Sequence, residues 1–122
     1  MPSVDLTYVL DILNAAQLAQ TFVAGVDKAA FMQDLMRQSA VLRQLEVMGE
    51  AAKQVSPSFK VAHPEIPWRQ IVGMRDILIH AYRRVDMDIV WTATQVSISQ
   101  VIPQLEALIS STTNDTPIDL PT

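Results

Sequence analysis

Apolar residues along this chain recur at intervals of three and four positions, the spacing that places them on one face of an α-helix. The first such stretch begins after Ser3, whose hydroxyl can cap a helix, and ends near Gly25, a natural helix stop. The second begins after Asp27 and continues to about Val55, with a local break expected at 34–38. Both stretches therefore predict long helices rather than strands.

A connector rich in proline and serine separates the second stretch from a third. Residues 56–66 are expected to be irregular, and Pro67 fits the first turn of the next helix, where its missing N–H breaks no hydrogen bond. The apolar stripe of this third helix consists of Trp68, Ile71, Met74, Ile77, Leu78 and Ala81. The pattern predicts one helix that continues to about Tyr82.

Two helix-breaking residues lie inside the apolar pattern and modify it. Gly49 predicts a close approach of two helices, because a glycine within a helix otherwise costs up to about 1 kcal/mol relative to alanine. Pro103 lies in a fourth apolar stretch, which begins after Asp86 or Asp88 and ends near Ile109. A kink or a fresh helix start is therefore expected at Pro103.

The four stretches together predict an all-α bundle of four to five helices. None of them shows the alternation of a strand, and the sequence contains no internal repeat. A single helical domain over residues 1–110 is expected, because no linker divides this part of the chain. Residues 111–122 are rich in serine, threonine, aspartate and proline, which is typical of a flexible C-terminal tail.

Composition places the chain among globular proteins and excludes several classes. Of its 122 residues 49% are hydrophobic and 18% charged, which allows a sizeable core and does not fit a disordered chain. The absence of cysteine excludes disulfide frameworks and thiolate metal sites. Asp5 and Asp11 do not suit a secretory signal, and no run of about 18 apolar residues suggests a membrane span, so a cytoplasmic location is expected.

The charge is distributed unevenly, and this changes what a net charge of −4 implies. Residues 53–84 hold six basic against two acidic residues, a net charge of +4, whereas residues 85–122 hold five acids and no base. A local positive patch on an acidic protein indicates an anion or phosphate footprint. An ordinary solvated charged face would give the same pattern.

The third helix carries a concentration of side chains suited to chemistry. At 100° per residue, Arg75 and Tyr82 fall on one flank of the apolar stripe, and Asp76 and His80 fall on the other. Ile79 lies between the two flanks and points away from the core. An apolar residue in this position indicates that the face meets a partner, such as a two-fold copy of the chain.

The same residues also have purely structural interpretations. A lone helical histidine such as His80 is usually structural, Asp76 can pair with His80 or Arg83 along the helix, and Tyr82 can pack with its hydroxyl in solvent. His63 and His80 do not have the spacing of metal ligands. Glycine-rich phosphate loops and nucleophile elbows are also missing from the sequence.

The segment Arg75-Asp76-x-x-x-His80-x-Tyr82 resembles the R-[polar]-x(3)-H-x-Y motif of HEPN-domain proteins. Three flanking blocks, at 44–53, 63–69 and 85–91, are similar to the HepT-type (DUF86) branch of this superfamily and stand in the same order. The resemblance covers roughly residues 5–109. The motif and the flanking blocks together support a HEPN-like fold for the helical domain.

This resemblance implies a metal-independent endoribonuclease that needs no cofactor and acts as the toxin of a prokaryotic type VII-like toxin–antitoxin pair. In the family, two motifs face a shared cleft in a homodimer. Arg75 and His80 would be the catalytic residues, with Asp76 and Tyr82 in support. The implied partner is a minimal nucleotidyltransferase antitoxin (MNT, MntA-like), which in some members transfers AMP to the motif tyrosine, here Tyr82.

The basic residues near the motif are candidates for contacts with the RNA backbone: Lys53, Arg69, Arg83 and Arg84. The sequence departs from the family pattern at two places, because many members have asparagine where this chain has Asp76 and glycine where it has Ala81. A carboxylate at the phosphate site would weaken RNA binding or raise the pKa of His80. The alternative function is a non-catalytic helical binding or assembly module that pairs with a nucleotidyltransferase.

Overall fold

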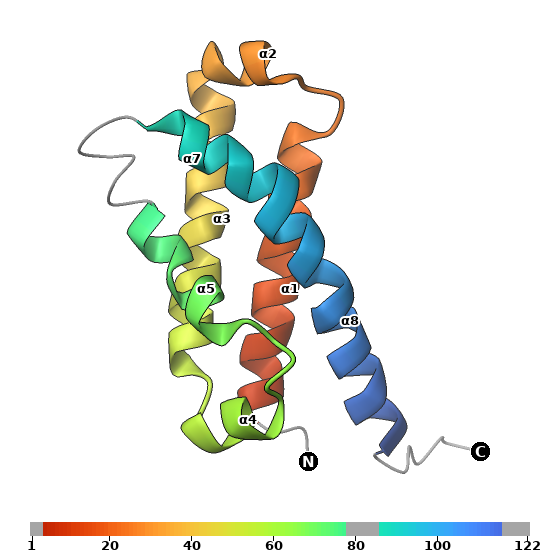
Figure 1. Ribbon diagram of the computed structural model, residues 1–122. Helices are drawn as coiled ribbons and strands as arrows, with labels where there is room; N and C mark the ends of the chain where they lie inside the picture. Colours follow the sequence, from red (N-terminus) through yellow and green to blue (C-terminus); the bar gives the residue numbers. More distant parts are fainter. Residues whose placement is uncertain (1–3, 78–85, 116–122) are drawn as a thin grey trace.

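The computed structural model describes residues 4–77 and 86–115, and every regular element in these ranges is helical, which confirms the all-α prediction (Figure 1). The elements are α1 (Val4–Val23), α2 (Lys28–Met32), α3 (Leu35–Gln54), α4 (Pro57–Ala62), α5 (Trp68–Val72), α7 (Met87–Thr92), the π-helical turn η1 (Ala93–Ser97) and α8 (Ile98–Asp115). Residues 74–77 are also helical. In these ranges no helix is both long and apolar enough to cross a membrane.

Helices α1 and α3 form the central pair of the bundle, with α8 packed against α1 and α5 against α3 (Figure 1). The buried face of α1 is rich in alanine, with Ala15, Ala16 and Ala19 at 0–1% exposure. The facing side of α3 contributes Val41, Leu45 and Met48, which are fully buried. Each large apolar side chain buried in this way contributes about 1.5–3 kcal/mol to the stability of the fold. This burial stabilises the pair of helices on which the other elements pack.

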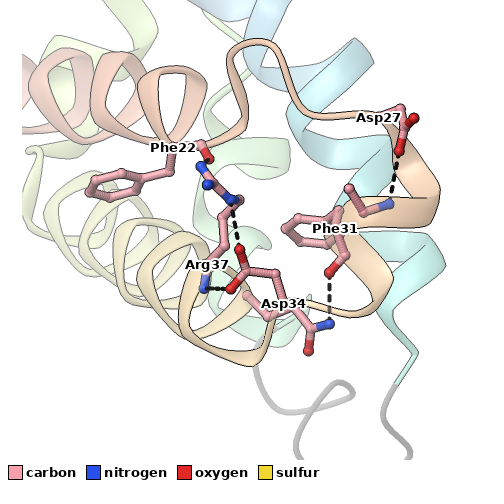
Figure 2. Close-up of polar contacts among 7 residues, drawn as sticks. Phe22, Asp27, Phe31, Asp34 and Arg37 are labelled. Carbon is pink, nitrogen blue, oxygen red and sulfur yellow. Dashed lines mark hydrogen bonds and ion pairs between the residues drawn. The ribbon is translucent and has the colours of Figure 1, made fainter.

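The second helix is interrupted as expected, but the break lies at Gln33 and Asp34 between α2 and α3, at the start of the expected range 34–38 (Figure 2). The carboxylate of Asp34 caps α3 by accepting a hydrogen bond from the backbone N–H of Arg37 at 3.0 Å. The Arg37 guanidinium also donates to Asp34 and to the carbonyl oxygen of Phe22 at the end of α1. Gln38, which is buried, donates to the carbonyl oxygen of Phe31 at 2.9 Å, so polar groups join all three helices.

The connector at 56–66 is more regular than the sequence pattern predicted, because it contains α4. Ser56 caps this short helix by accepting from the backbone N–H of Phe59, and Pro57 occupies its first turn, where proline is favoured. The carboxylate of Asp5 accepts hydrogen bonds at 2.7 Å from both the backbone N–H and the hydroxyl of Ser56. These contacts fix the connector to the start of α1.

The last helical run begins at the N-cap Asp86, as the sequence predicted, but it does not start afresh at Pro103. Helix α8 is continuous across Pro103, and the π-helical turn η1 precedes it in the same run. The buried side chains around the proline are Val101, Ile102, Leu105 and Leu108. At about 1.5–3 kcal/mol each, their burial exceeds the roughly 3 kcal/mol that a proline costs within a helix.

Helix α8 continues to Asp115, past the expected start of the tail at residue 111. In this last part of the helix, the hydroxyl of Thr112 donates to the carbonyl oxygen of Leu108 at 2.8 Å. Residues 116–122 lie outside the described part of the chain.

Candidate active site

The described part of the motif helix is divided in two at Gly73. The sequence pattern predicted one helix from Pro67, but α5 ends at Val72 and the chain turns at Gly73 before the helix resumes over 74–77. Glycine has a poor helix propensity, and its N–H caps α5 by donating to the carbonyl oxygen of Arg69 at 3.0 Å. Residues 74–77 therefore form a separate short helical segment, called the motif segment below. Its first residue, Met74, is buried.

This segment packs closely on α3 at Gly49, as the mid-helix glycine predicted. A Cβ atom at Gly49 would lie 2.9 Å from both the Cβ and the backbone nitrogen of Arg75, and 3.1 Å from the carbonyl oxygen of Val72. Such distances are shorter than the roughly 3.5–4.0 Å of a favourable contact. The missing side chain of Gly49 therefore sets how closely the backbone of Arg75 approaches α3.

The next residue on α3 engages the other end of the Arg75 side chain. Nη1 of Arg75 lies 2.8 Å from a carboxylate oxygen of Glu50, and the two side chains are 46% and 45% exposed. The pair joins α3 to the motif segment at the protein surface. Sequence reasoning did not predict this partner, although Glu50 lies in the 44–53 block that carried part of the family resemblance.

The structure places the other predicted site residues as follows. Asp76 is exposed one residue after Arg75, Lys53 is exposed in the last turn of α3, and Arg69 is exposed on α5. Arg75, Lys53 and Arg69 therefore come from three segments that pack together through α3. The remaining predicted site residues, together with Ile79, lie outside the described ranges: His80, Tyr82, Arg83 and Arg84.

A hollow of about 420 Å³ borders the motif segment on the side of α7. Ile77 contributes one wall, and Asp86, Asp88 and Ile89 contribute another. The lining thus combines apolar surface with carboxylates, whereas the basic residues of the motif segment, α3 and α5 lie elsewhere. Over 4–77 and 86–115, no three histidine, aspartate or glutamate side chains gather in a way that could hold a metal ion.

These observations define a class of protein. It is an all-α bundle in which the arginine of an R-x(4)-H segment packs against a glycine and pairs with a glutamate. The profile of the family described as "Ribonuclease HepT-like" matches residues 12–109, which is most of the chain. The chain belongs to this family of HepT-like ribonucleases. The proposed HEPN HepT-type resemblance is therefore confirmed at the level of the family.

Individual relatives agree with this assignment. A protein of Thermococcus cleftensis named "Probable ribonuclease HepT" is 41% identical over 101 residues, which cover 83% of this chain and 92% of the relative. A protein of Caldanaerobacter subterraneus named "Putative RNase TTE0752" is 36% identical over 99 residues, covering 81% of this chain and 85% of the relative. No solved structure matches the chain at a significant level.

Proposed function

We propose that this protein is a metal-independent endoribonuclease in which Arg75 and His80 cleave RNA. The observation that carries the proposal is the pair of contacts that Arg75 makes with α3. Its backbone packs against Gly49, and its guanidinium pairs with Glu50 at the surface. An arginine fixed at both ends and half exposed suits the binding of a phosphate group. The family membership and the ribonuclease names of the relatives support the same activity.

The proposed reaction is a transesterification at an RNA phosphate. A histidine takes the proton of the 2′-hydroxyl, the 2′ oxygen attacks phosphorus, and the bond from phosphorus to the 5′ oxygen breaks. The leaving oxygen receives a proton and becomes a 5′-hydroxyl, while the other product ends in a 2′,3′-cyclic phosphate. Arg75 binds the non-bridging oxygens of the phosphate and stabilises the charge that develops on them. Asp76 orients His80 from one turn earlier.

Both proton transfers need an imidazole, and a homodimer can supply two. In the proposed arrangement, two copies place their motifs across a shared cleft, and His80 of one copy acts as base while the partner's His80 acts as acid. Ile79 lies at this interface. The basic residues Lys53, Arg69, Arg83 and Arg84 bind the RNA backbone on either side without reading its sequence.

A second protein is proposed to control the enzyme. The partner is an antitoxin of the minimal nucleotidyltransferase type, which neutralises the toxin by modifying Tyr82. In that reaction the phenol oxygen of Tyr82 attacks the α-phosphorus of ATP, an AMP group is transferred, and pyrophosphate leaves. The added phosphate carries negative charge and bulk next to Arg75, so it competes with the RNA phosphate.

Cleavage assays on matched variants test the proposal. Wild-type protein, Arg75→Ala and His80→Ala are purified, checked for folding by circular dichroism and incubated with single-stranded RNA. Both variants should lose cleavage and should no longer arrest growth when expressed. If both are folded and still cut RNA at the wild-type rate, the nuclease proposal is wrong. If wild-type protein itself is folded and cleaves no RNA, the protein is instead the alternative, a non-catalytic helical module that binds a nucleotidyltransferase.

A further inference from the structure

The contact between α3 and the motif segment involves two consecutive residues with different effects on Arg75. Gly49 sets the position of the Arg75 backbone, since any larger residue would meet its Cβ and nitrogen at 2.9 Å. Glu50 holds the far end of the same side chain through Nη1 at 2.8 Å. A long side chain that is 46% exposed is thus restrained at both ends by one turn of α3.

The geometry of the guanidinium leaves room for a second anion. The group is planar and carries five N–H donors, and a phosphate is bound best by two parallel donors on one edge. Glu50 engages Nη1, so the edge formed by Nε and Nη2 remains available; within 4–77 and 86–115 it makes no hydrogen bond. One carboxylate can therefore restrain the position of Nη1 without occupying the pair of donors that a phosphate would use.

We infer that Glu50 is a positioning residue for Arg75, which holds its Nη1 so that the Nε–Nη2 edge is directed at the scissile phosphate. This inference rests on the proposed ribonuclease function and adds a residue to it. Glu50 touches no reacting atom and acts through Arg75 alone. The carboxylate of Glu50 also places a negative charge near the phosphate. This charge repels RNA, so Glu50 orients Arg75 but weakens RNA binding.

The test compares Glu50→Ala and Glu50→Gln with wild-type protein, using an end-labelled single-stranded RNA of mixed sequence as the probe. Glu50→Ala should lower kcat by roughly 10-fold, because a misplaced catalytic group can cost up to about 100-fold. KM should stay unchanged or fall, because a negative charge near the RNA is lost. Glu50→Gln should give an intermediate kcat, since its amide oxygen can still approach Nη1 of Arg75 but carries no full charge.

Two controls separate positioning from a loss of folding. Glu106→Ala, a change of the same kind at an exposed position of α8, should leave kcat at the wild-type value. The urea midpoint of Glu50→Ala should match that of wild-type protein, because half-exposed ion pairs contribute little to stability. A fall in kcat that Glu106→Ala shares, or that accompanies a lowered urea midpoint, would mark the role of Glu50 as structural and overturn the inference.

The assay also distinguishes a failure of this inference from a failure of the proposed function. If Arg75→Ala abolishes cleavage while the kcat of Glu50→Ala stays at or above that of wild type, Glu50 does not position Arg75, and the nuclease proposal stands. If Arg75→Ala cleaves as well as wild type, the proposed function itself is wrong, and the inference fails with it.

Discussion

Replacing Gly49 by alanine tests whether the contact between α3 and the motif segment fixes Arg75. The added Cβ would lie 2.9 Å from the Cβ and nitrogen of Arg75 and 3.1 Å from the carbonyl oxygen of Val72. Atoms in favourable contact are about 3.5–4.0 Å apart, so the 2.9 Å contacts are roughly 0.6–1.1 Å too short. These contacts involve backbone and Cβ atoms, so the segment itself has to move.

Two opposing terms decide the change in stability. Alanine in place of glycine within a helix gains about 1 kcal/mol, and overpacking of this kind costs about 1–3 kcal/mol. The free energy of unfolding should therefore fall by roughly 0–2 kcal/mol. The effect on activity should be larger, because a shift of about 1 Å in a catalytic group can cost roughly 100-fold in rate. We expect kcat to fall at least 10-fold.

Urea unfolding followed by circular dichroism gives the first quantity, and RNA cleavage gives the second. Ser39→Ala is the matched control, because Ser39 is exposed on the same helix and the change gains helix propensity without a new close contact. This control should be slightly stabilised and fully active. If Gly49→Ala is instead more stable by about 1 kcal/mol and cleaves RNA at the wild-type rate, the close contact does not exist in solution, and the reasoning is refuted.

Three further predictions concern capping, RNA binding and assembly. Hydrogen bonds from the backbone and side chain of Arg37 hold the pKa of Asp34 below its ordinary value, so this carboxylate stabilises the fold above the ordinary pKa and loses that effect as pH falls through the lowered value. Asp34→Asn should therefore lower the urea midpoint at neutral pH, with a smaller difference in acid; equal midpoints at neutral pH would contradict this. Alanine at Lys53 and at Arg69 should weaken RNA binding irrespective of sequence and reduce the slope of log affinity against log salt by about 0.7 per charge removed, and an unchanged slope would place these residues off the RNA path. Ile79→Asp should reduce the mass in solution from dimer to monomer while the protein stays helical, and an unaltered mass would argue against the proposed interface.

Local sequence signals predicted much of the fold. The caps Asp27 and Asp86 begin helices α2 and α7 as expected, because a side chain that bonds to the backbone three residues later acts within one turn. The close contact at Gly49 was also predictable, since a glycine in the middle of a helix is costly without one. These features depend on few residues near one another in the sequence.

Features that depend on competing or distant interactions were harder to predict. Helix α4 was missed because its proline and serine residues favour turns as well as helix starts, and because the contact of Ser56 with Asp5 joins residues far apart in the sequence. The interruption at Gly73 was missed because the apolar stripe continues across it. The ion pair of Glu50 with Arg75 joins residues from separate helices, and no local spacing could reveal it.

The candidate site was also predicted only in part from the sequence. The sequence pointed to Arg75, and the structure adds the two α3 residues that hold it. The role of His80 stays a prediction, because it lies outside the described residues and rests on the motif.

The chemistry of the RNA ends produced by the purified protein tests the central claim most directly. Wild-type protein is incubated with a single-stranded RNA in the presence of EDTA, and the fragments are analysed by mass spectrometry. We expect fragments with 2′,3′-cyclic phosphate and 5′-hydroxyl ends, and none with Arg75→Ala or His80→Ala. Cleavage that stops on addition of EDTA, or fragments with 5′-phosphate ends, would contradict a metal-independent transesterification by Arg75 and His80.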